Sequence, residues 1–525
     1  MFCFQCEETH QGTGCLKSGV CGKTELTASL SDLLLRLLKE LAAAGLASGK
    51  PDRDRGFFLA RGLYSTVTNV KFDPESYGRL IDEAWEQFRS LAGGRPAGPG
   101  TAFSALPETA SLEEKAGLGR KFALHGPFTP AASLKETVLY GLKGLAAYAY
   151  HARTLDFEDD TLWSFLDLAL AESLKPNLTL DGWLNLALQT GGENLKALEL
   201  LDRAHRTAFG APAPVRVSLG FRKGPAVLIS GHDLNILAGL LPQAEEAGVS
   251  VYTHGEMLPA HGYPGLRSPA LAGHFGTAWP NQRRELPEFP GPAVFTSNCL
   301  TPPKGDYIER LFTAGLCAFP QVRHLAGNPA GACFWSQVLA EAKKNGGFRE
   351  TAGGPSVWSG WGWGAVLAEG GKIAGLIRQG RIKNFLLAGG CDGSREVRNS
   401  YRELVKKAPP ETVVLTLGCG KFRFLDLDLG EIEGIPRLLD LGQCNDAFSA
   451  VKILQGLSQA LETPVSDLPV QIAVSWYEQK AAAILLSLLH LGIRNISLGP
   501  SRPAFLHPEI MKTLADSFGL KAALS

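Results

Sequence analysis

The sequence predicts a multidomain α + α/β protein, in which an N-terminal helical-bundle domain is followed by two α/β domains with largely parallel sheets. Three observations support this fold class. The chain has 525 residues, which is too long for one ordinary hydrophobic core. Apolar residues recur at helical spacing between about residues 27 and 206. Beyond residue 212, short β-branched or apolar runs alternate with helical stretches.

The N-terminal domain is expected to consist of helical bundles. Apolar side chains at three- and four-residue spacing predict helices in three clear segments, 30–47, 134–154 and 162–173. Proline and glycine cluster at 92–100, where a connection is expected, and again at 210–213. The second cluster places a domain boundary near Pro212, so the first domain is expected to span residues 1–211.

The alternating part of the chain predicts two parallel-sheet domains. Candidate strands lie in eight segments, 226–232, 249–256, 293–299, 384–393, 412–420, 438–444, 472–479 and 495–500. The glycine-rich segment 353–364 separates two sets of these units, which gives domains at 212–356 and 357–525. This segment carries three tryptophans that we expect to pack between domains rather than to form a cofactor platform: Trp358, Trp361 and Trp363.

Composition and charge narrow the class of partners. Hydrophobic residues make up 45% and charged residues 20% of the chain, and the formal net charge is zero. A neutral chain offers no electrostatic attraction to nucleic acid or to an acidic membrane surface. The sequence has no run of 18 uncharged apolar residues and no basic and then apolar leader, so a cytoplasmic protein is expected. No GxGxxG fingerprint follows a strand and opens a helix, so no bound nicotinamide or flavin is expected.

The ten cysteines fall into two groups, and the first group lies at the N-terminus. It consists of four residues in a glycine-rich stretch, Cys3, Cys6, Cys15 and Cys21. In a reducing compartment such crowding favours metal ligation over disulfides. Four thiolates can hold a cubane iron–sulfur cluster, because glycine lets backbone amides approach the sulfurs. A structural zinc site is the alternative, since zinc also accepts four cysteines.

A second group of potential ligands follows the predicted strands. Seven residues end seven strands: His232, Glu256, Cys299, Cys391, Cys419, Cys444 and Glu478. In open α/β sheets, sites form beyond the carboxyl ends of the strands, so we expect these side chains to converge across a domain interface. Oxygen and nitrogen ligands beside thiolates suit irons that are exposed to exchangeable oxygen species. Taken singly, such a histidine is commonly a structural hydrogen-bonding residue, and such a glutamate commonly caps a helix.

Two further cysteines lack comparable partners. Cys317 lies in GLCAFP and Cys333 lies in GACFWS, both of which are apolar surroundings. We expect both to be buried structural thiols.

The chain resembles the hybrid-cluster protein family, also called hydroxylamine reductases. The resemblance spans the chain from Cys3 to beyond Glu478 and rests on long motifs. These motifs are FCFQCEET with Cys15 and Cys21, GHDL at His232, HGEMLPAHGYP at Glu256, TSNCLTPP at Cys299, AGGCDG at Cys391, the residues Cys419 and Cys444, and SWYEQKA at Glu478. The long helical region resembles the form of the family with two helical bundles in its first domain.

The resemblance implies two iron–sulfur clusters. One is a [4Fe–4S] cluster on Cys3, Cys6, Cys15 and Cys21, in place of zinc or of a [2Fe–2S] cluster. The other is a hybrid [4Fe–2O–2S]-type cluster on the seven strand-end residues. Cys391 matches the cysteine that family members carry as a persulfide. Cys317, Cys333 and the tryptophan-rich stretch at 358–363 fall outside the family motifs.

The resemblance also implies a reaction, the two-electron reduction of hydroxylamine to ammonia and water, with electrons entering at the N-terminal cluster. Because the chain shows no nicotinamide or flavin fingerprint, we expect these electrons to come from a separate electron-donor protein. Glu478 and Cys391 would lie at the reacting centre, and Lys480 or His261 would supply protons. Each of the last two has a structural alternative, which is surface solvation for Lys480 and structural hydrogen bonding for His261.

Other functions compete with this interpretation. Nitric oxide is a second plausible substrate, because a reduced, open iron centre binds it readily. A nitrosative-stress sensor or protein S-nitrosylation partner is an alternative from a different class, in which turnover is incidental. A carbon monoxide dehydrogenase relative is a lesser alternative, and the two glutamate motifs and the N-terminal cysteine spacing argue against it.

Overall fold

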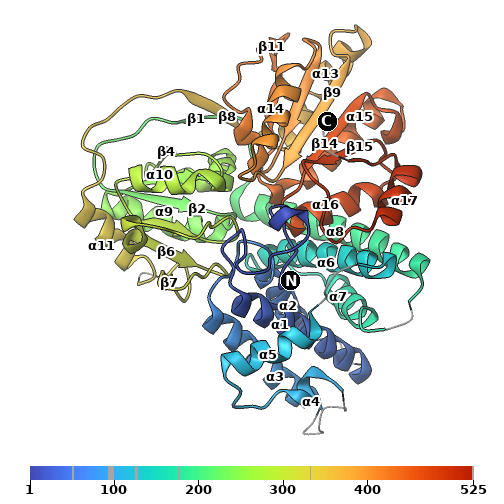
Figure 1. Cartoon of the computed structure of the whole chain (residues 1–525). Helices are drawn as coiled ribbons and strands as arrows, with labels where there is room; N and C mark the ends of the chain where they lie inside the picture. Colours follow the sequence, from blue (N-terminus) through green and yellow to red (C-terminus); the bar gives the residue numbers. More distant parts are fainter. Residues whose placement is uncertain (50–51, 93–99, 124–127, 176–177, 332, 523–525) are drawn as a thin grey trace.

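The computed structural model describes residues 1–49, 52–92, 100–123, 128–175, 178–331 and 333–522. It contains an all-helical part followed by two α/β parts, so the predicted fold class is confirmed. Figure 1 shows the helical part at the bottom and right, the first α/β part at the left, and the second α/β part at the top and upper right. The N-terminal loop, in dark blue, lies at the centre of the molecule where the three parts meet.

Eight α-helices within the described ranges form the first part. They are α1 (Glu25–Ser48), α2 (Arg53–Ser65), α3 (Pro74–Ala92), α4 (Ala102–Ala105), α5 (Leu112–Phe122), α6 (Pro130–Arg153), α7 (Asp160–Glu172) and α8 (Leu180–Phe209). The predicted helix 30–47 lies within α1, whose leucines form the centre of the helical core. Thr24 caps α1 by accepting a hydrogen bond from the N–H of Thr27 at 3.2 Å. The helices α6 and α8 pack along each other and face the C-terminal part.

The first sheet has six parallel strands in the order β4-β3-β2-β5-β6-β7. Its strands are β2 (Ala226–Ser230), β3 (Ser250–His254), β4 (Leu271–His274), β5 (Ala293–Phe295), β6 (Leu311–Ala314) and β7 (Arg323–Leu325). Its helices are α9 (Leu234–Ala247), α10 (Gln282–Glu288) and α11 (Ser336–Asn345). Every residue of the central strand β2 is buried, as expected for a parallel strand that is covered on both faces.

The second sheet also has six parallel strands, in the order β13-β10-β9-β14-β15-β16. Its strands are β9 (Asn384–Gly390), β10 (Thr412–Thr416), β13 (Leu438–Asp440), β14 (Val470–Ser475), β15 (Ile496–Gly499) and β16 (Lys521–Ala522). Its helices are α12 (Trp363–Ala368), α13 (Gly370–Arg378), α14 (Asn399–Lys406), α15 (Phe448–Leu461), α16 (Gln479–His490) and α17 (Pro508–Phe518). A small hairpin, β11 (Glu431–Ile432) and β12 (Ile435–Pro436), lies before β13.

An antiparallel ribbon of β1 (Val215–Ser218) and β8 (Ser356–Ser359) joins the two α/β parts. The expected domain limits at 211/212 and 356/357 therefore fall between α8 and β1 and inside β8, and they stay predictions. The predicted packing between domains is confirmed for Trp363. Its indole N–H donates to the Asp202 carboxylate at 3.2 Å, and the Arg206 guanidinium lies 4.2 Å from its ring centroid. Both of these partners belong to α8, whereas Trp363 begins α12.

Glycines let α16 approach the helical part closely. A Cβ at Gly144 of α6 would collide with the Cβ of Ala483 and would lie 3.1 Å from the Cα of Lys480. A Cβ at Gly191 of α8 would collide with the backbone carbonyl of Leu486. The helix α16 is therefore held in place by two helices from the first domain, with α6 against its N-terminal half and α8 against its C-terminal half.

We expect Gly144→Ala to destabilise the protein by about 1–3 kcal/mol, because the added methyl group overpacks the contact with α16. Gly375→Ala is the matched control. Gly375 also lies inside a helix, but nothing lies within 4 Å of its Cβ position. The control should stabilise the protein by about 0.5–1 kcal/mol, since alanine is the better helix former. Thermal unfolding of both variants checks this, and a stabilised Gly144→Ala would contradict the close packing.

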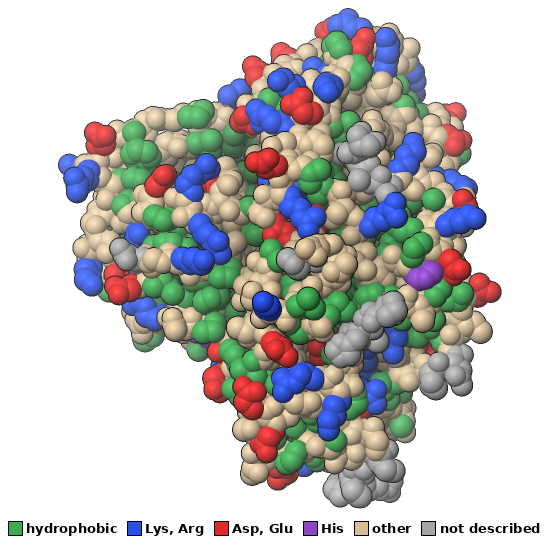
Figure 2. Space-filling view, viewed as in Figure 1, with side chains coloured by type: hydrophobic (Ala, Val, Ile, Leu, Met, Phe, Trp, Pro, Cys, Tyr) green, Lys and Arg blue, Asp and Glu red, His purple; other side chains and the backbone are tan. Residues whose placement is uncertain are grey.

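Charges of both signs are mixed over the face shown in Figure 2, in keeping with the formal net charge of zero. Across the described ranges, no helix has the length and apolar character needed to cross a membrane.

Candidate metal centres

The seven side chains that follow seven strands line one cavity of about 330 Å³ in the interior of the protein. His232, Glu256 and Cys299 follow β2, β3 and β5 of the first sheet, and Cys391, Cys419, Cys444 and Glu478 follow β9, β10, β13 and β14 of the second. The carboxyl ends of the two parallel sheets thus meet at this cavity. The structure brings together all seven residues that the sequence singled out.

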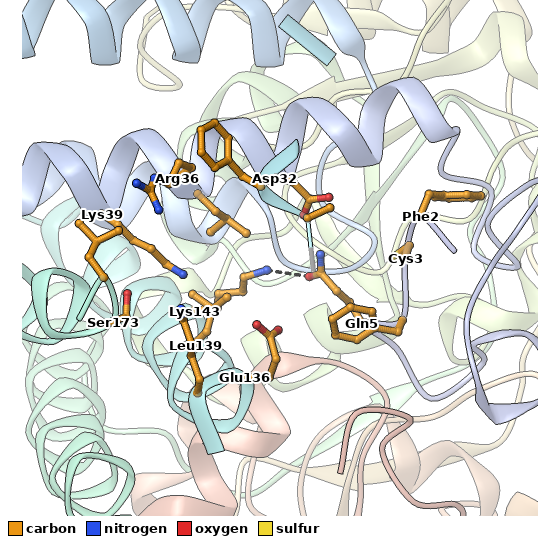
Figure 3. A pocket seen from close by; sticks show the side chains of 16 residues that line it. Phe2, Cys3, Gln5, Asp32, Arg36, Lys39, Glu136, Leu139, Lys143 and Ser173 are labelled. Carbon is orange, nitrogen blue, oxygen red and sulfur yellow. Dashed lines mark hydrogen bonds between the residues drawn. The ribbon is translucent and has the colours of Figure 1, made fainter. Parts of the chain in front are cut away.

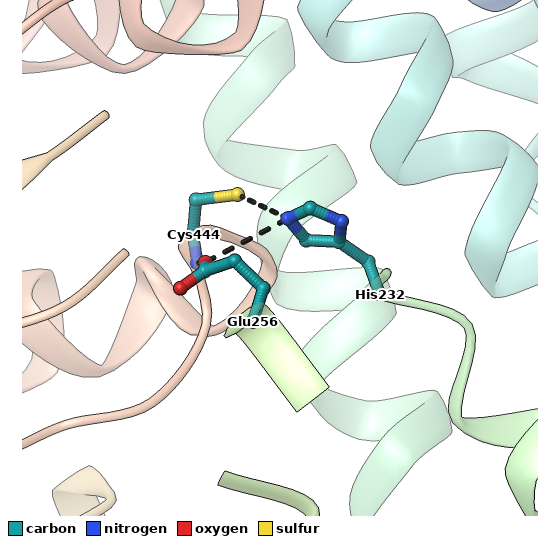
Figure 4. Close-up of side chains that lie close together, drawn as sticks. All are labelled: His232, Glu256 and Cys444. Carbon is teal, nitrogen blue, oxygen red and sulfur yellow. Dashed lines mark hydrogen bonds and ion pairs between the residues drawn. The ribbon is translucent and has the colours of Figure 1, made fainter. Parts of the chain in front are cut away.

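Three of these residues come closest to one another (Figure 4). The Nε2 of His232 lies 3.2 Å from the Sγ of Cys444 and 3.6 Å from Oε2 of Glu256. On its other side, Nδ1 of His232 lies 3.0 Å from the hydroxyl of Ser297, which orients the ring. Burial lowers the pKa of His232 to about 4, so the imidazole is neutral and its nitrogen is available as a ligand.

The three remaining sulfurs complete the wall of the cavity. The Sγ of Cys419 accepts a hydrogen bond from the backbone N–H of Asp392 at 2.9 Å, and the thiol of Cys419 donates a hydrogen bond to the sulfur of Cys299. Cys299 has a φ of +79°, an uncommon backbone conformation for a residue with a side chain. Burial raises the pKa of Cys391 well above its usual value, and the same holds for Cys444. Without a cation, these crowded thiols resist ionisation.

Glu478 lies at the N-cap of α16, where Oε2 accepts a hydrogen bond from the backbone N–H of Lys480 at 2.9 Å. Burial raises the pKa of Glu478. Lys480 is only 1% exposed, so surface solvation of this residue is excluded. Its Nζ donates to the Sγ of Cys444 at 3.1 Å and to Oδ1 of Asn298 at 3.2 Å. A positive charge therefore lies directly against the sulfur of Cys444.

His261 has a different setting and is not among the residues that line this cavity. Its Nε2 lies 3.1 Å from the hydroxyl of Thr253, which also lies 2.9 Å from Nδ1 of His274. Burial lowers the pKa of His261 to about 4. His261 thus makes the structural hydrogen bonds that were the alternative to its expected role as a proton donor.

The donor set fits a cluster with mixed ligands. Oε1 of Glu256 and Oδ1 of Asn69 are buried at the cavity and have no hydrogen-bond partner among the described residues. Such orphaned acceptors fit a cation or a donor that completes the site. Four sulfurs, one neutral imidazole and two carboxylates exceed what tetrahedral zinc accepts, and they combine soft with hard ligands. The cavity therefore fits an iron–sulfur centre with oxygen ligation better than it fits zinc.

The four N-terminal cysteines lie in one folded loop. Cys3 and Cys15 face each other in a backbone bridge, with the N–H of Cys15 donating to the carbonyl of Cys3 at 2.7 Å. The thiol of Cys6 donates a hydrogen bond to Cys21, which lowers the pKa of Cys21 to about 6. Burial raises the pKa of Cys3 to about 12. The buried ammonium of Lys23 favours the thiolate forms of Cys3 and Cys21. This loop has the donors for a four-cysteine metal site.

A second cavity, of about 740 Å³, adjoins Cys3 between the N-terminal loop and the helices α1 and α6 (Figure 3). Charged groups line it, including Asp32, Lys39 and Glu136. The Nζ of Lys143 crosses from α6 to donate to Oε1 of Gln5 at 2.6 Å. The helical part thus holds the N-terminal loop by a polar contact beside Cys3.

The two candidate centres are joined by aromatic and backbone contacts. Tyr477 and Trp279 pack at 4.6 Å between ring centroids, in a buried cluster that also contains Cys6 and Cys419. The N–H of Glu7 donates to the carbonyl of Tyr477 at 3.0 Å, next to Glu478. Arg398 hydrogen-bonds to segments of both candidate centres. It donates to the carboxylate of Glu7 at 3.1 Å and to the carbonyl of Cys391 at 2.9 Å.

The expectation for the two remaining cysteines is half right. Cys317 is fully buried, as predicted. The prediction for Cys333 is wrong, because Cys333 is exposed. It lies in the turn before α11, where Phe334 and Trp335 point into the core and leave the neighbouring thiol outside.

Sequence reasoning missed several residues at the site, among them Asn298, Trp279 and Arg398. Asn298 adjoins Cys299 in the strand-end segment and could have been found there. Trp279 and Arg398 lie in three-residue 3-10 helices without any regular pattern, so no signal in the sequence marks them.

Comparison with known proteins gives full-length relatives. A profile of the Prismane/CO dehydrogenase family matches residues 1–525. The hydroxylamine reductase of Syntrophobacter fumaroxidans is 45% identical over 534 residues, which cover 99% of this chain and 97% of that protein. The hydroxylamine reductase of Methanocella arvoryzae is 43% identical over 533 residues, with the same coverage.

Solved structures with the same fold have much lower identity. Carbon monoxide dehydrogenase IV from Carboxydothermus hydrogenoformans superimposes with a TM-score of 0.56 at 17% identity, covering 99% of this chain and 90% of that chain. A chain from a structure of acetyl-CoA synthase/carbon monoxide dehydrogenase gives a TM-score of 0.57 at 15% identity, covering 96% of this chain and 81% of that chain. These structures support the architecture. The full-length family match and relatives with up to 45% identity confirm the resemblance seen in the sequence, and this chain belongs to the Prismane/CO dehydrogenase family.

Proposed function

We propose that the protein is an iron–sulfur oxidoreductase that reduces hydroxylamine to ammonia and water. The observation that carries this proposal is the convergence of seven strand-end ligands in one buried cavity, with the ammonium of Lys480 3.1 Å from the sulfur of Cys444. Relatives that match 99% of this chain and are named hydroxylamine reductase support it. The solved structures with the same fold are carbon monoxide dehydrogenases, but they are only 15–17% identical to this chain. They therefore support a carbon monoxide reaction much less than the relatives support hydroxylamine reduction.

We assign a [4Fe–4S] cluster to Cys3, Cys6, Cys15 and Cys21, and a hybrid [4Fe–2O–2S]-type cluster to the seven cavity residues. Family membership and the two cysteine-rich donor sets support iron–sulfur cofactors. Cys391, half-buried beside Glu478, is the residue to which we assign the persulfide. When bound, the second cluster would supply electrons and a Lewis-acidic iron for cleavage of the N–O bond.

The cavity system selects a small, uncharged substrate. An almost wholly apolar cavity of about 670 Å³ reaches Cys391, Cys444, Glu478 and Lys480. Alanine, valine and leucine side chains from α15, α16 and the second sheet line it. Apolar walls exclude bulk water and ions, and they admit neutral molecules of the size of hydroxylamine.

Reduction of hydroxylamine consumes two electrons and two protons, and yields one ammonia and one water. Lys480 is the buried cation at the cavity, and its Nζ can pass a proton to the departing oxygen or nitrogen. Glu478 accepts the backbone N–H of Lys480 and so fixes the start of α16. Electrons from a separate donor protein would enter at the N-terminal cysteines and cross through the layer of Tyr477 and Trp279.

Nitric oxide is a second candidate substrate, because the apolar cavity admits it equally well. A nitrosative-stress sensor with the same centres would bind nitric oxide in a single stoichiometric reaction and would not turn over. Steady turnover with reduced methyl viologen supports an enzyme, whereas a single stoichiometric reaction supports the sensor.

The direct test is an anaerobic assay of the parent protein with hydroxylamine and reduced methyl viologen. We expect one ammonia formed for each hydroxylamine and two viologen radicals consumed, over many turnovers. Ammonia and viologen are measured independently. Viologen oxidation without ammonia would contradict the proposed reaction.

A further inference from the structure

We propose that two residues of the helical domain, Tyr64 of α2 and His151 of α6, act as positioning residues that hold Lys480 against Cys444 through Asn298. The inference deepens the proposed function and rests on it, in that Lys480 is the proton donor there. It assigns the N-terminal bundle a part in the active site, although none of the seven cavity ligands comes from that bundle.

Asn298 is the junction of this arrangement. Its Oδ1 accepts a hydrogen bond from Nζ of Lys480 at 3.2 Å and from the hydroxyl of Tyr64 at 3.3 Å. A carbonyl oxygen has two lone pairs, so both bonds form together. Both groups donate to the same oxygen, so no proton passes between them there. The contact therefore orients the Lys480 ammonium and does not supply it with a proton.

His151 fixes the direction of the tyrosine hydroxyl. Nε2 of His151 lies 3.0 Å from the hydroxyl oxygen of Tyr64. Because the single proton of Tyr64 points at Asn298, the oxygen is left to accept the Nε2–H of His151. Burial lowers the pKa of His151 well below its usual value, so the ring is neutral and carries one N–H. A chain of directed bonds thus runs from His151 to Tyr64 to Asn298.

All four groups are buried, with exposed fractions of 0% for Tyr64, 1% for Lys480, 2% for Asn298 and 3% for His151. A lysine side chain has four rotatable bonds, and an ammonium needs fixed acceptors to stay in one place. Nζ of Lys480 has two acceptors, Asn298 and Cys444, among the described residues. Since an ammonium has three N–H groups, the third is left for substrate at the cavity that Lys480 lines.

The test compares Tyr64→Phe with Tyr150→Phe. Tyr150 is the matched control, because its ring packs 5.5 Å from that of Tyr64 but its hydroxyl makes no hydrogen bond within the described network. We expect Tyr64→Phe to lower kcat for hydroxylamine about tenfold with KM within about twofold, because Lys480 loses its fixed orientation. Tyr150→Phe should keep the parent kcat. Both variants should keep parental iron content and electron paramagnetic resonance spectra.

A histidine pair tests the direction of the bonds. His151→Gln places an amide N–H near the position of Nε2 and should retain most of kcat, whereas His151→Leu should behave like Tyr64→Phe. Equal kcat for Tyr64→Phe and the parent would overturn the inference. So would equal losses of kcat and iron in Tyr64→Phe and Tyr150→Phe, since that would show a purely structural role.

A crystal structure of Tyr64→Phe gives a readout that does not depend on activity. We expect Nζ of Lys480 to move by more than about 1 Å from its place between Asn298 and Cys444. An unmoved Nζ would overturn the inference even if turnover fell. If the parent itself reduces no hydroxylamine, the proposed function fails, and this comparison still decides whether Tyr64 positions Lys480.

Discussion

Glu478→Gln should abolish hydroxylamine reduction, with a loss in kcat of at least about 100-fold, because the substitution removes a charged ligand from the cavity. Glutamine keeps the length of the side chain and an oxygen that can accept the N–H of Lys480, so the cap of α16 survives. The variant therefore separates the role of the carboxylate as a ligand from its role as a helix cap. Turnover with reduced methyl viologen measures the effect.

The control is the same exchange at another helix cap. Asp159 caps α7 and accepts the N–H of Thr161 at 2.8 Å, and neither residue lines the cavity of the seven ligands. Asp159→Asn should keep the parental kcat. The electron paramagnetic resonance signal of the second centre should change in Glu478→Gln alone. A Glu478→Gln variant with parental kcat and spectrum would show that Glu478 is a cap and not a ligand.

The second large effect is expected for Cys6→Ala. Cys6 is 5% exposed and lies in the cluster with Trp279 and Tyr477. Loss of one of four thiolates should empty the N-terminal site of about four irons per chain, while the second centre keeps its own. Turnover with a protein donor should then fall by about 100-fold or more, because electrons no longer enter at that loop. Iron analysis, spectroscopy and turnover are measured together.

The exposed cysteine offers the control for this change. Cys333→Ala removes an exposed thiol that is not among the residues lining the cavity of the seven candidate ligands, and it should change neither iron content nor turnover. If Cys6→Ala kept its iron and its rate, the N-terminal cysteines would not form the site through which electrons enter.

The convergence of the seven candidate ligands could be predicted because parallel strands place their carboxyl ends at one edge. His232 and Glu256 lie two residues beyond strands of one sheet, Cys299 lies in the segment after β5 of that sheet, and Cys391 directly follows β9 of the other. The sequence signals a strand by its apolar run, and the polar residue that ends the run marks the site. The helix expected at 30–47 was found for a similar reason, as its leucines recur at helical spacing.

The rest of the site depends on contacts between distant segments. Tyr64 and His151 are 87 positions apart, and Asn298 lies 234 positions from Tyr64. Tyr64 and His151 belong to helices with an ordinary apolar pattern, so no local signal marks them, whereas Asn298 could be found only through its neighbour Cys299. The wrong prediction for Cys333 has a similar cause, because apolar neighbours do not determine which way a turn residue faces. Phe334 and Trp335 are buried while Cys333 is exposed.

The central claim is that this chain holds two iron–sulfur centres, one on four cysteines and one on mixed ligands. The most direct test is metal and sulfide analysis of anaerobically purified protein, together with electron paramagnetic resonance. The account predicts about eight irons per chain, about four at each site, two distinct spectra and no stoichiometric zinc. Stoichiometric zinc, or a single cluster with about four irons per chain, would contradict it.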